Sequence, residues 1–145
     1  DQWRSMRRAR PVAGFTLIEL LVVLVILGLL AGLAGPRVLS YVSAAKTDTA
    51  TLQIEELGAV LDLYYLDFGK YPETSEGLVV LAENSSNDAR WNGPYLKKPV
   101  VPDDPWGRPY VYRSPGEHGE YDLYSLGADN AEGGTGDSQD VVSWR

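Results

Sequence analysis

The sequence contains no cysteine and a single histidine, His118, among its 145 residues. Without cysteine, no disulfide can close the fold and no thiolate can serve as a nucleophile or metal ligand. His118 lies in a glycine-rich turn, where it supplies neither a metal-binding pair of histidines nor a Ser/His/Asp triad. The carboxylates Asp103 and Asp104 adjoin two prolines, so we expect them in a turn and not as an acid–base pair. The sequence therefore argues against an enzyme.

Basic residues are scarce beyond the first 14 positions. The chain has 13 Lys and Arg against 20 Asp and Glu, a formal net charge of −7. Residues 1–14 hold four of the arginines and one aspartate, so the remainder carries 9 basic and 19 acidic side chains, a net charge of −10. Because nucleic-acid binding needs clustered lysine and arginine, we expect no nucleic-acid partner. The acidic remainder is typical of a solvated domain and is compatible with cation binding.

One long hydrophobic run occupies residues 15–35, FTLIELLVVLVILGLLAGLAG, and contains a single charge, Glu19. As an α-helix these 21 residues would extend about 31 Å, close to the thickness of the hydrocarbon core of a bilayer. The arginines before the run predict a cytoplasmic N-terminus and a domain on the opposite side of the membrane. No small-residue cleavage site follows the run, which is unlike a secretory signal; a plain signal anchor stays open as an alternative.

Glu19 is the one residue of this run that needs an explanation. A carboxylate at the centre of a bilayer costs about 2.5–3.5 kcal/mol on insertion scales, so it normally has a partner. The nearest candidate would be an α-ammonium group at Phe15, in the same chain or in a neighbouring one, which exists only if the chain is cleaved there. The alternative is a carboxylate that reaches the lipid headgroups. Further along, Pro36 is expected to kink or loosen the helix over residues 32–36.

A second helical pattern runs from Arg37 to about Leu66. Apolar residues recur at spacings of 3, 4 and 3, which places them on one face, and acidic residues recur every seven positions on another. We expect the apolar face to pack in a domain core and Gly69 to cap the helix. The apolar face comprises Ile54, Leu57, Leu61 and Tyr64, and the acidic stripe comprises Asp48, Glu55 and Asp62.

The remaining segments predict a small antiparallel sheet. Residues 109–113 and 121–125 are typical of the two strands of a β-hairpin, and residues 141–144 of a third short strand. Packed against the long helix, this sheet makes an α+β domain. A short helix is also expected over residues 76–83. We expect it to be capped by Thr74 or Ser75 and to bury Leu78, Val79 and Leu81.

The segment from Leu126 to Asp140 is a long acidic loop. It contains four carboxylates, four glycines and no basic residue. A loop of this kind is either functional or disordered, and the repulsion between its carboxylates would be relieved by a hard cation. Calcium accepts 6–8 oxygens from carboxylates and carbonyls, although the spacing is not that of an EF-hand. On composition alone, a calcium site and a disordered acidic loop both stay open.

The sequence Gly14-Phe15-Thr16-Leu17-Ile18-Glu19 resembles the N-terminal motif of the type IV pilin-like family. The resemblance implies cleavage by a prepilin peptidase between Gly14 and Phe15, followed by N-methylation of Phe15. It also implies that Glu19 pairs with the N-terminus of an adjacent subunit and sets the register of a polymer.

From Gly14 to Trp144 the chain is similar to the major pseudopilins of type II secretion systems. Family members bind one calcium ion in the C-terminal loop. Carried over by position, the resemblance implies ligation by the carbonyl of Leu126 and the carboxylates of Asp129 and Asp140. The chain departs from the family pattern at Ser138 and Gln139, so Asp137 is only a candidate third carboxylate. The similarity is carried by residues 53–71, Gly77-Leu78, 93–97, Asp104-Pro-Trp-Gly107, Ser114-Pro-Gly116 and Asp122-Leu-Tyr-Ser-Leu-Gly-Ala-Asp129.

The resemblance implies a type IV pilin-like α+β fold in three parts: a leader removed by prepilin peptidase (1–14), a transmembrane and assembly helix (15–35) and a periplasmic domain (36–145). The subunit would polymerise from the bacterial inner membrane, N-terminus in the cytoplasm, into a helical filament that drives folded proteins across the outer membrane. Implied partners are further copies, minor pseudopilins, an inner-membrane platform protein, a secretion ATPase and membrane lipid.

Two other functions share part of this pattern. A major pilin of a type IV pilus would have the same N-terminus, but usually closes its C-terminal region with cysteines. A membrane-tethered calcium-binding module would have the acidic loop but no need for Gly14-Phe15 or Glu19.

Overall fold

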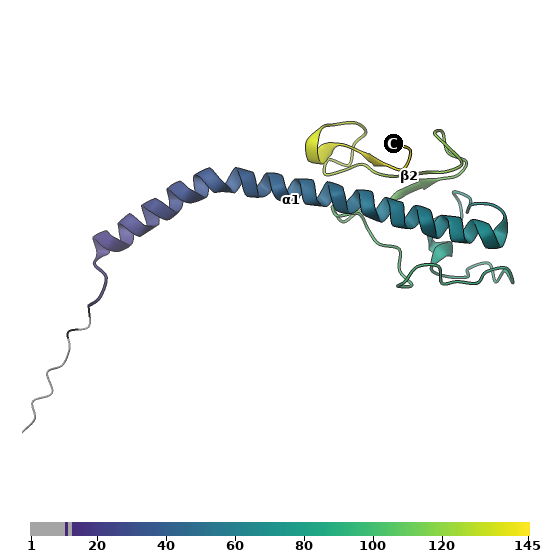
Figure 1. Cartoon of the computed structure of the whole chain (residues 1–145), viewed down its shortest axis with the longest axis horizontal. Coiled ribbons are helices and arrows are strands. Elements are labelled where there is room, and N and C mark those ends of the chain that lie inside the picture. Colours follow the sequence, from purple (N-terminus) through teal and green to yellow (C-terminus); the bar gives the residue numbers. More distant parts are fainter. Residues whose placement is uncertain (1–10, 12) are drawn as a thin grey trace, which may run out of the picture. The chain divides into compact units, whose positions relative to one another are not determined.

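The computed structural model describes residue 11 and residues 13–145; most of the expected leader, 1–14, lies outside the described residues. The elements are a long helix, two 3₁₀ helices and three short strands, in the order α1, η1, β1, β2, η2, β3 (Figure 1). Residues 40–145 form one compact unit, and the chain up to Leu39 forms another.

Helix α1 extends over Leu17–Phe68 and continues through Pro36 without interruption. Its N-terminal part exposes nearly all of its leucines, valines and isoleucines. By length and composition α1 could cross a membrane, and none of its apolar window is buried within the protein. The helix ends as predicted at Gly69, which has a φ of 71° and donates its N–H to the Tyr65 carbonyl at 2.7 Å.

The domain half of α1 contributes one face to the hydrophobic core. The four residues predicted for this face, Ile54, Leu57, Leu61 and Tyr64, are all buried, and Ala50 extends the face by one turn. Leu123 and Val141 of the sheet and Leu81 of η1 pack in the same cluster. The periodicity therefore identified the buried face correctly, and the acidic stripe of Asp48, Glu55 and Asp62 is exposed as expected.

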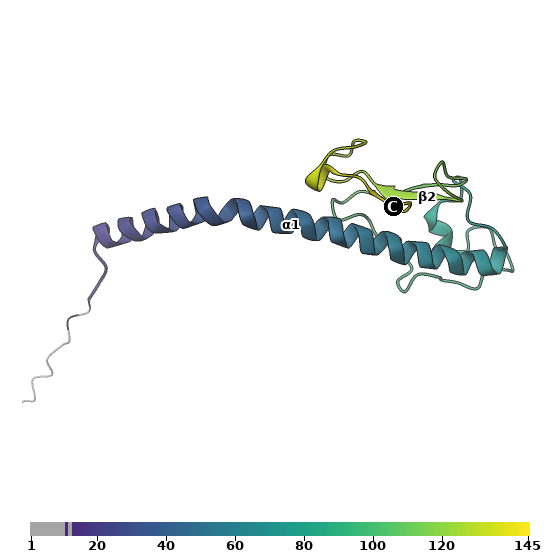
Figure 2. The same cartoon turned by 45° about the horizontal axis from the view of Figure 1, so that its top comes forward.

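The sheet has three antiparallel strands, as the sequence predicted, although the strands are shorter, and their order is β1-β2-β3. Strand β1 covers Val111–Arg113, β2 Asp122–Ser125 and β3 Val141–Val142. Tyr112 pairs with Leu123 across the hairpin, and Ser125 pairs with Val141. Both cartoon views show β2 and the yellow C-terminal loop lying beside the domain half of α1 (Figures 1 and 2).

The short helix after α1 differs from its prediction. It is a 3₁₀ helix, η1, over Leu78–Leu81, its N-cap is Gly77, and no side chain caps it. Thr74 instead bonds across the domain: its hydroxyl accepts the N–H of Ser114 at 2.8 Å and donates to the Ser114 carbonyl at 3.0 Å. A helix with three residues per turn presents a different face, so Val80 is buried and Val79 is exposed.

Candidate functional site

Two regions carry the predicted site residues, and the first is the start of α1. Gly14 and Phe15 precede the helix, and the Phe15 side chain is 88% exposed. Thr16 and Glu19 form a capping box: the Glu19 N–H donates to the Thr16 hydroxyl at 3.2 Å, and the Thr16 N–H donates to the Glu19 carboxylate at 3.4 Å. Glu19 is therefore hydrogen-bonded within the first turn of its own helix.

Thr16 is part of the predicted N-terminal motif, but its role as a helix cap was not predicted. The signal was present, since Thr-x-x-Glu directly before an apolar run is the pattern of a capping box. Cleavage before Phe15 would place a new ammonium group one residue from this cap.

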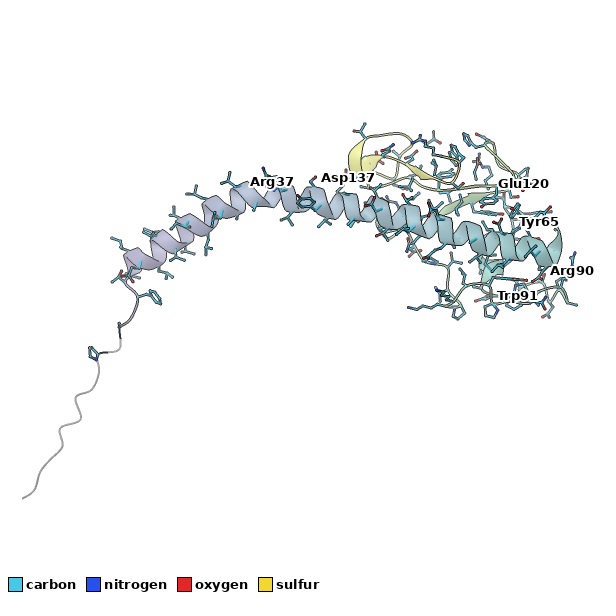
Figure 3. All side chains as sticks on the ribbon, in the orientation of Figure 1. Arg37, Tyr65, Arg90, Trp91, Glu120 and Asp137 are labelled. Carbon is cyan, nitrogen blue, oxygen red and sulfur yellow. The ribbon has the colours of Figure 1, made fainter. Side chains whose placement is uncertain are left out.

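The second region is the acidic loop from Leu126 to Asp140, whose ends are held together by the Ser125–Val141 pair. The four predicted ligand residues lie at different places in it. Leu126 is half-buried at its start, and Asp129 is exposed, where its carboxylate accepts the Ala131 N–H at 3.1 Å. Asp137 is exposed within η2, Gly136–Ser138, at the end of the domain opposite Glu120 (Figure 3).

Asp140 is the loop carboxylate whose hydrogen bonding is incomplete among the described residues. One oxygen, Oδ2, accepts the Gly133 N–H at 3.0 Å. The other, Oδ1, is buried and has no hydrogen-bond partner among the described residues. A buried carboxylate oxygen without a donor is costly, so this atom is suited to a cation or an ordered water.

The two arms of the loop are joined by their backbone and not by a cluster of carboxylates within the described residues. The Ala128 N–H donates to the Asp137 carbonyl at 2.9 Å. Within the described part of the chain, no three side chains of Asp, Glu, His or Cys converge as a metal-binding group. A cation in this loop would therefore depend on backbone carbonyls as well as on Asp140, a mixture of oxygen ligands that calcium accepts.

Asp104 lies at the base of this loop, although the sequence predicted only a turn residue. It does form the turn, because Oδ1 accepts the backbone N–H groups of Trp106 at 3.1 Å and Arg108 at 2.8 Å. Its other oxygen accepts the Ser125 hydroxyl at 2.7 Å. Asp103, in contrast, is exposed.

The single histidine belongs to a structural cluster. His118 Nδ1 lies 3.1 Å from the buried Asp122 carboxylate, and its ring stacks on Trp144 with 3.9 Å between centroids. Burial raises the pKa of the Asp122 carboxyl, but hydrogen bonds from the His118 side chain and from the backbone N–H groups of Glu117 and His118 outweigh it and leave the pKa below its usual value. Within the described residues, no hydroxyl is hydrogen-bonded to His118, so this cluster is not a triad.

Comparisons with known proteins agree with this architecture. The family model described as "Type II secretion system (T2SS), protein G" matches residues 37–144, and the "Prokaryotic N-terminal methylation motif" matches residues 9–35. The chain is 47% identical to the type II secretion system core protein G of Pseudomonas aeruginosa over 139 residues, covering 93% of this chain and 96% of that protein. It is 42% identical to the core protein G of Vibrio cholerae, covering 96% of each.

A solved structure shares the fold. The crystal structure of the major pseudopilin from the type 2 secretion system of enterohaemorrhagic Escherichia coli matches with a TM-score of 0.56 and 30% identity, over 70% of this chain and 88% of that one. The fold, a long N-terminal helix with a small antiparallel sheet, is thus that of a pseudopilin. The chain belongs to the family of type II secretion system protein G.

Proposed function

We propose that this chain is the major structural subunit of a type II secretion pseudopilus and not an enzyme. The observation that carries the proposal is the combination of family membership with a long exposed apolar helix that begins at the methylation motif. Such a helix must be covered by lipid or by other helices, because a surface of this size is unstable in water. Lipid would cover it before assembly, and neighbouring subunits would cover it in the filament.

The arginines that precede the helix support a topology in which the N-terminus is cytoplasmic and residues 36–145 are periplasmic. Prepilin peptidase would cleave between Gly14 and Phe15, and Phe15 would then be N-methylated. The Phe15 amine of an incoming subunit would pair with Glu19 of its neighbour and fix the axial register. The platform protein, the secretion ATPase and minor pseudopilins would act on this polymer, which would push folded proteins outward.

Filament assembly tests this function. Overproduced chain in a cell with a type II system should form filaments visible by electron microscopy, and a strain lacking the chain should retain its exported proteins in the periplasm. Glu19→Ala should leave membrane insertion intact and abolish filaments. Thr16→Ala is the matched control, because it breaks the other half of the capping box but keeps the carboxylate. Normal filaments from Glu19→Ala, or an equal loss from Thr16→Ala, would contradict the assembly role of Glu19.

The proposal includes one calcium ion in the C-terminal loop. Asp140 supports it, because its buried Oδ1 has no donor among the described residues. Asp129 and the Leu126 carbonyl would complete the set from the first arm, and Asp137 is the third carboxylate candidate. The ion would neutralise these carboxylates and close the loop in a chain that has no cysteine for that purpose.

Chelation tests the ion separately from assembly. EGTA should lower the melting temperature and the protease resistance of the wild-type chain, and added calcium should restore both. Asp140→Asn should melt at the lower temperature with or without calcium. A wild-type chain whose melting temperature does not respond to EGTA would remove calcium from the account and leave the pseudopilin assignment in place.

A further inference from the structure

Asp104 has one more interaction than its turn requires. Its carboxylate is 5% exposed, and a buried charge of this kind must be fully hydrogen-bonded. Of its two carboxylate oxygens, Oδ1 is the one that bonds to the turn, through the N–H groups of Trp106 and Arg108, and the backbone adds a bond from the Asp104 N–H to the Arg108 carbonyl at 2.7 Å. The Oδ2 atom is directed out of the turn to the hydroxyl of Ser125, a residue 21 positions along the chain. This second half of the carboxylate connects the turn to the end of β2.

Ser125 links Asp104 to the first peptide group of the acidic loop. Its side chain is 1% exposed, and its hydroxyl has a single proton, which it donates to Asp104. The hydroxyl oxygen is then oriented to accept the Gly127 N–H, at 3.2 Å. The Arg108 guanidinium, from the same turn, donates to the Gly127 carbonyl. Both backbone polar groups of Gly127 are therefore hydrogen-bonded, the N–H to Ser125 and the carbonyl to Arg108.

The direction of the Leu126 carbonyl follows from this arrangement. Leu126 C=O and Gly127 N–H belong to one planar trans peptide group, in which the two bonds point in opposite directions. Because the N–H points to the Ser125 hydroxyl, the carbonyl must point away from Ser125. The carbonyl that the calcium proposal uses is thus fixed by a carboxylate that does not itself touch the ion.

Gly127 also sets how closely the two arms of the loop approach. Its φ is +72°, and a Cβ at this position would lie 2.8 Å from the Gln139 carbonyl oxygen and 2.9 Å from that of Asp137. The next residue, Ala128, is hydrogen-bonded to the Asp137 carbonyl. Displacing Gly127 would therefore move the second arm, which carries Asp140, relative to the first.

From these contacts we infer that Asp104 is a positioning residue for the cation site of the C-terminal loop, acting through the Ser125 hydroxyl on the Leu126–Gly127 peptide group. The inference rests on the proposed calcium site. Asp104 and Ser125 act in series, so losing either one frees the same peptide group. Outer-shell partners of metal ligands typically contribute about 10- to 100-fold to metal affinity, and we expect a loss of that size here.

The test compares three single variants of the full chain in detergent. Asp104→Asn replaces one carboxylate oxygen by an amide NH₂ group, which cannot accept a hydrogen bond. Ser125→Ala removes the hydroxyl that connects Asp104 to Gly127 but keeps the turn of Asp104. Asp103→Asn is the matched control, because it makes the same charge change at the exposed neighbouring residue. Each protein is stripped with EGTA, its melting temperature is recorded, and calcium binding is measured by titration calorimetry.

We expect Asp104→Asn and Ser125→Ala each to weaken calcium binding by about 10- to 100-fold, and the double variant to be no weaker than the worse single one. Asp103→Asn should bind as the wild type does. A purely structural role would lower the melting temperature in EGTA and leave the affinity unchanged, which would overturn the inference. Should Asp104→Asn fail to fold, Ser125→Ala decides by the same criterion. A wild-type chain that binds no calcium would overturn the calcium proposal and this inference together, whereas wild-type binding with unchanged variants would overturn the inference alone.

Discussion

Replacing Leu61 by alanine tests whether a single buried face of α1 holds the domain together. Leu61 is 0% exposed and lies in the core with Leu81 and Leu123, whereas Leu63, two positions further, is 50% exposed. A buried Leu→Ala change costs about 2–5 kcal/mol, since it loses transfer free energy and leaves a cavity. Because Leu61 is enclosed completely, we expect about 3 kcal/mol or more. Leu63→Ala, which removes less buried surface and opens no cavity, should cost about 1 kcal/mol.

These values convert to a large difference in melting temperature. In a domain of roughly 100 residues, 1 kcal/mol shifts the midpoint by about 4–8 °C, so Leu61→Ala should melt about 12 °C or more below the wild type and Leu63→Ala about 4–8 °C below it. The assay is thermal and urea unfolding of the full chain in detergent, followed by tryptophan fluorescence. Equal losses in the two variants would refute the assignment of the buried face.

Three further predictions concern the sheet side of the domain and the aromatic core. The folded-state pKa of Asp122 is lowered, so its contribution to stability is present above the unfolded pKa of about 3.9 and is lost as the pH falls below it; Asp122→Asn should flatten this acid dependence in urea unfolding. Burial, and next to it Glu76, raise the pKa of Tyr64 to about 12, so its contribution is present below pH about 10 and lost as the pH rises toward 12; Tyr64→Phe should remove the absorbance component that titrates near 12. Gly127→Ala should cost about 2 kcal/mol or more, since it adds a left-handed backbone penalty to a close contact, and chemical denaturation would measure it.

The sequence predicted those parts of the fold that follow from periodicity. A spacing of 3, 4 and 3 residues identified one helix face because a helix can bury only the side that points to the core; this face comprises Ile54, Leu57, Leu61 and Tyr64. The three-stranded sheet followed from short β-prone runs separated by turn residues. The strands were shorter than expected because only three residues of each strand pair across the hairpin.

Contacts between distant segments were beyond sequence reasoning. Thr74 precedes a short helix and looked like its cap, yet its hydroxyl bonds to Ser114, 40 positions away. Nothing in the local pattern distinguishes these two uses of a hydroxyl, because in both it accepts a backbone N–H, of the short helix in one and of a distant residue in the other. The hydrogen bond that the Ser125 hydroxyl donates to the Asp104 carboxylate was missed for the same reason.

The candidate site residues also fall into two groups, those that a sequence motif identifies and those that depend on the fold. Gly14, Phe15 and Glu19 are contiguous in the sequence, so a motif identifies them without a structure. The proposed loop ligands depend on how two arms meet. The structure shows the Ala128–Asp137 backbone bond between the arms, and among the described residues no three acidic side chains converge there. Composition could indicate a cation there but could not supply this geometry.

Mass spectrometry of the N-terminus of the protein isolated from membranes tests whether the chain is processed as a pseudopilin. The proposed function requires that residues 1–14 are removed and that the apolar helix is kept. We therefore predict a peptide that begins with N-methylated Phe15. A mature protein that retains Gly14 and the arginines before it would contradict the account.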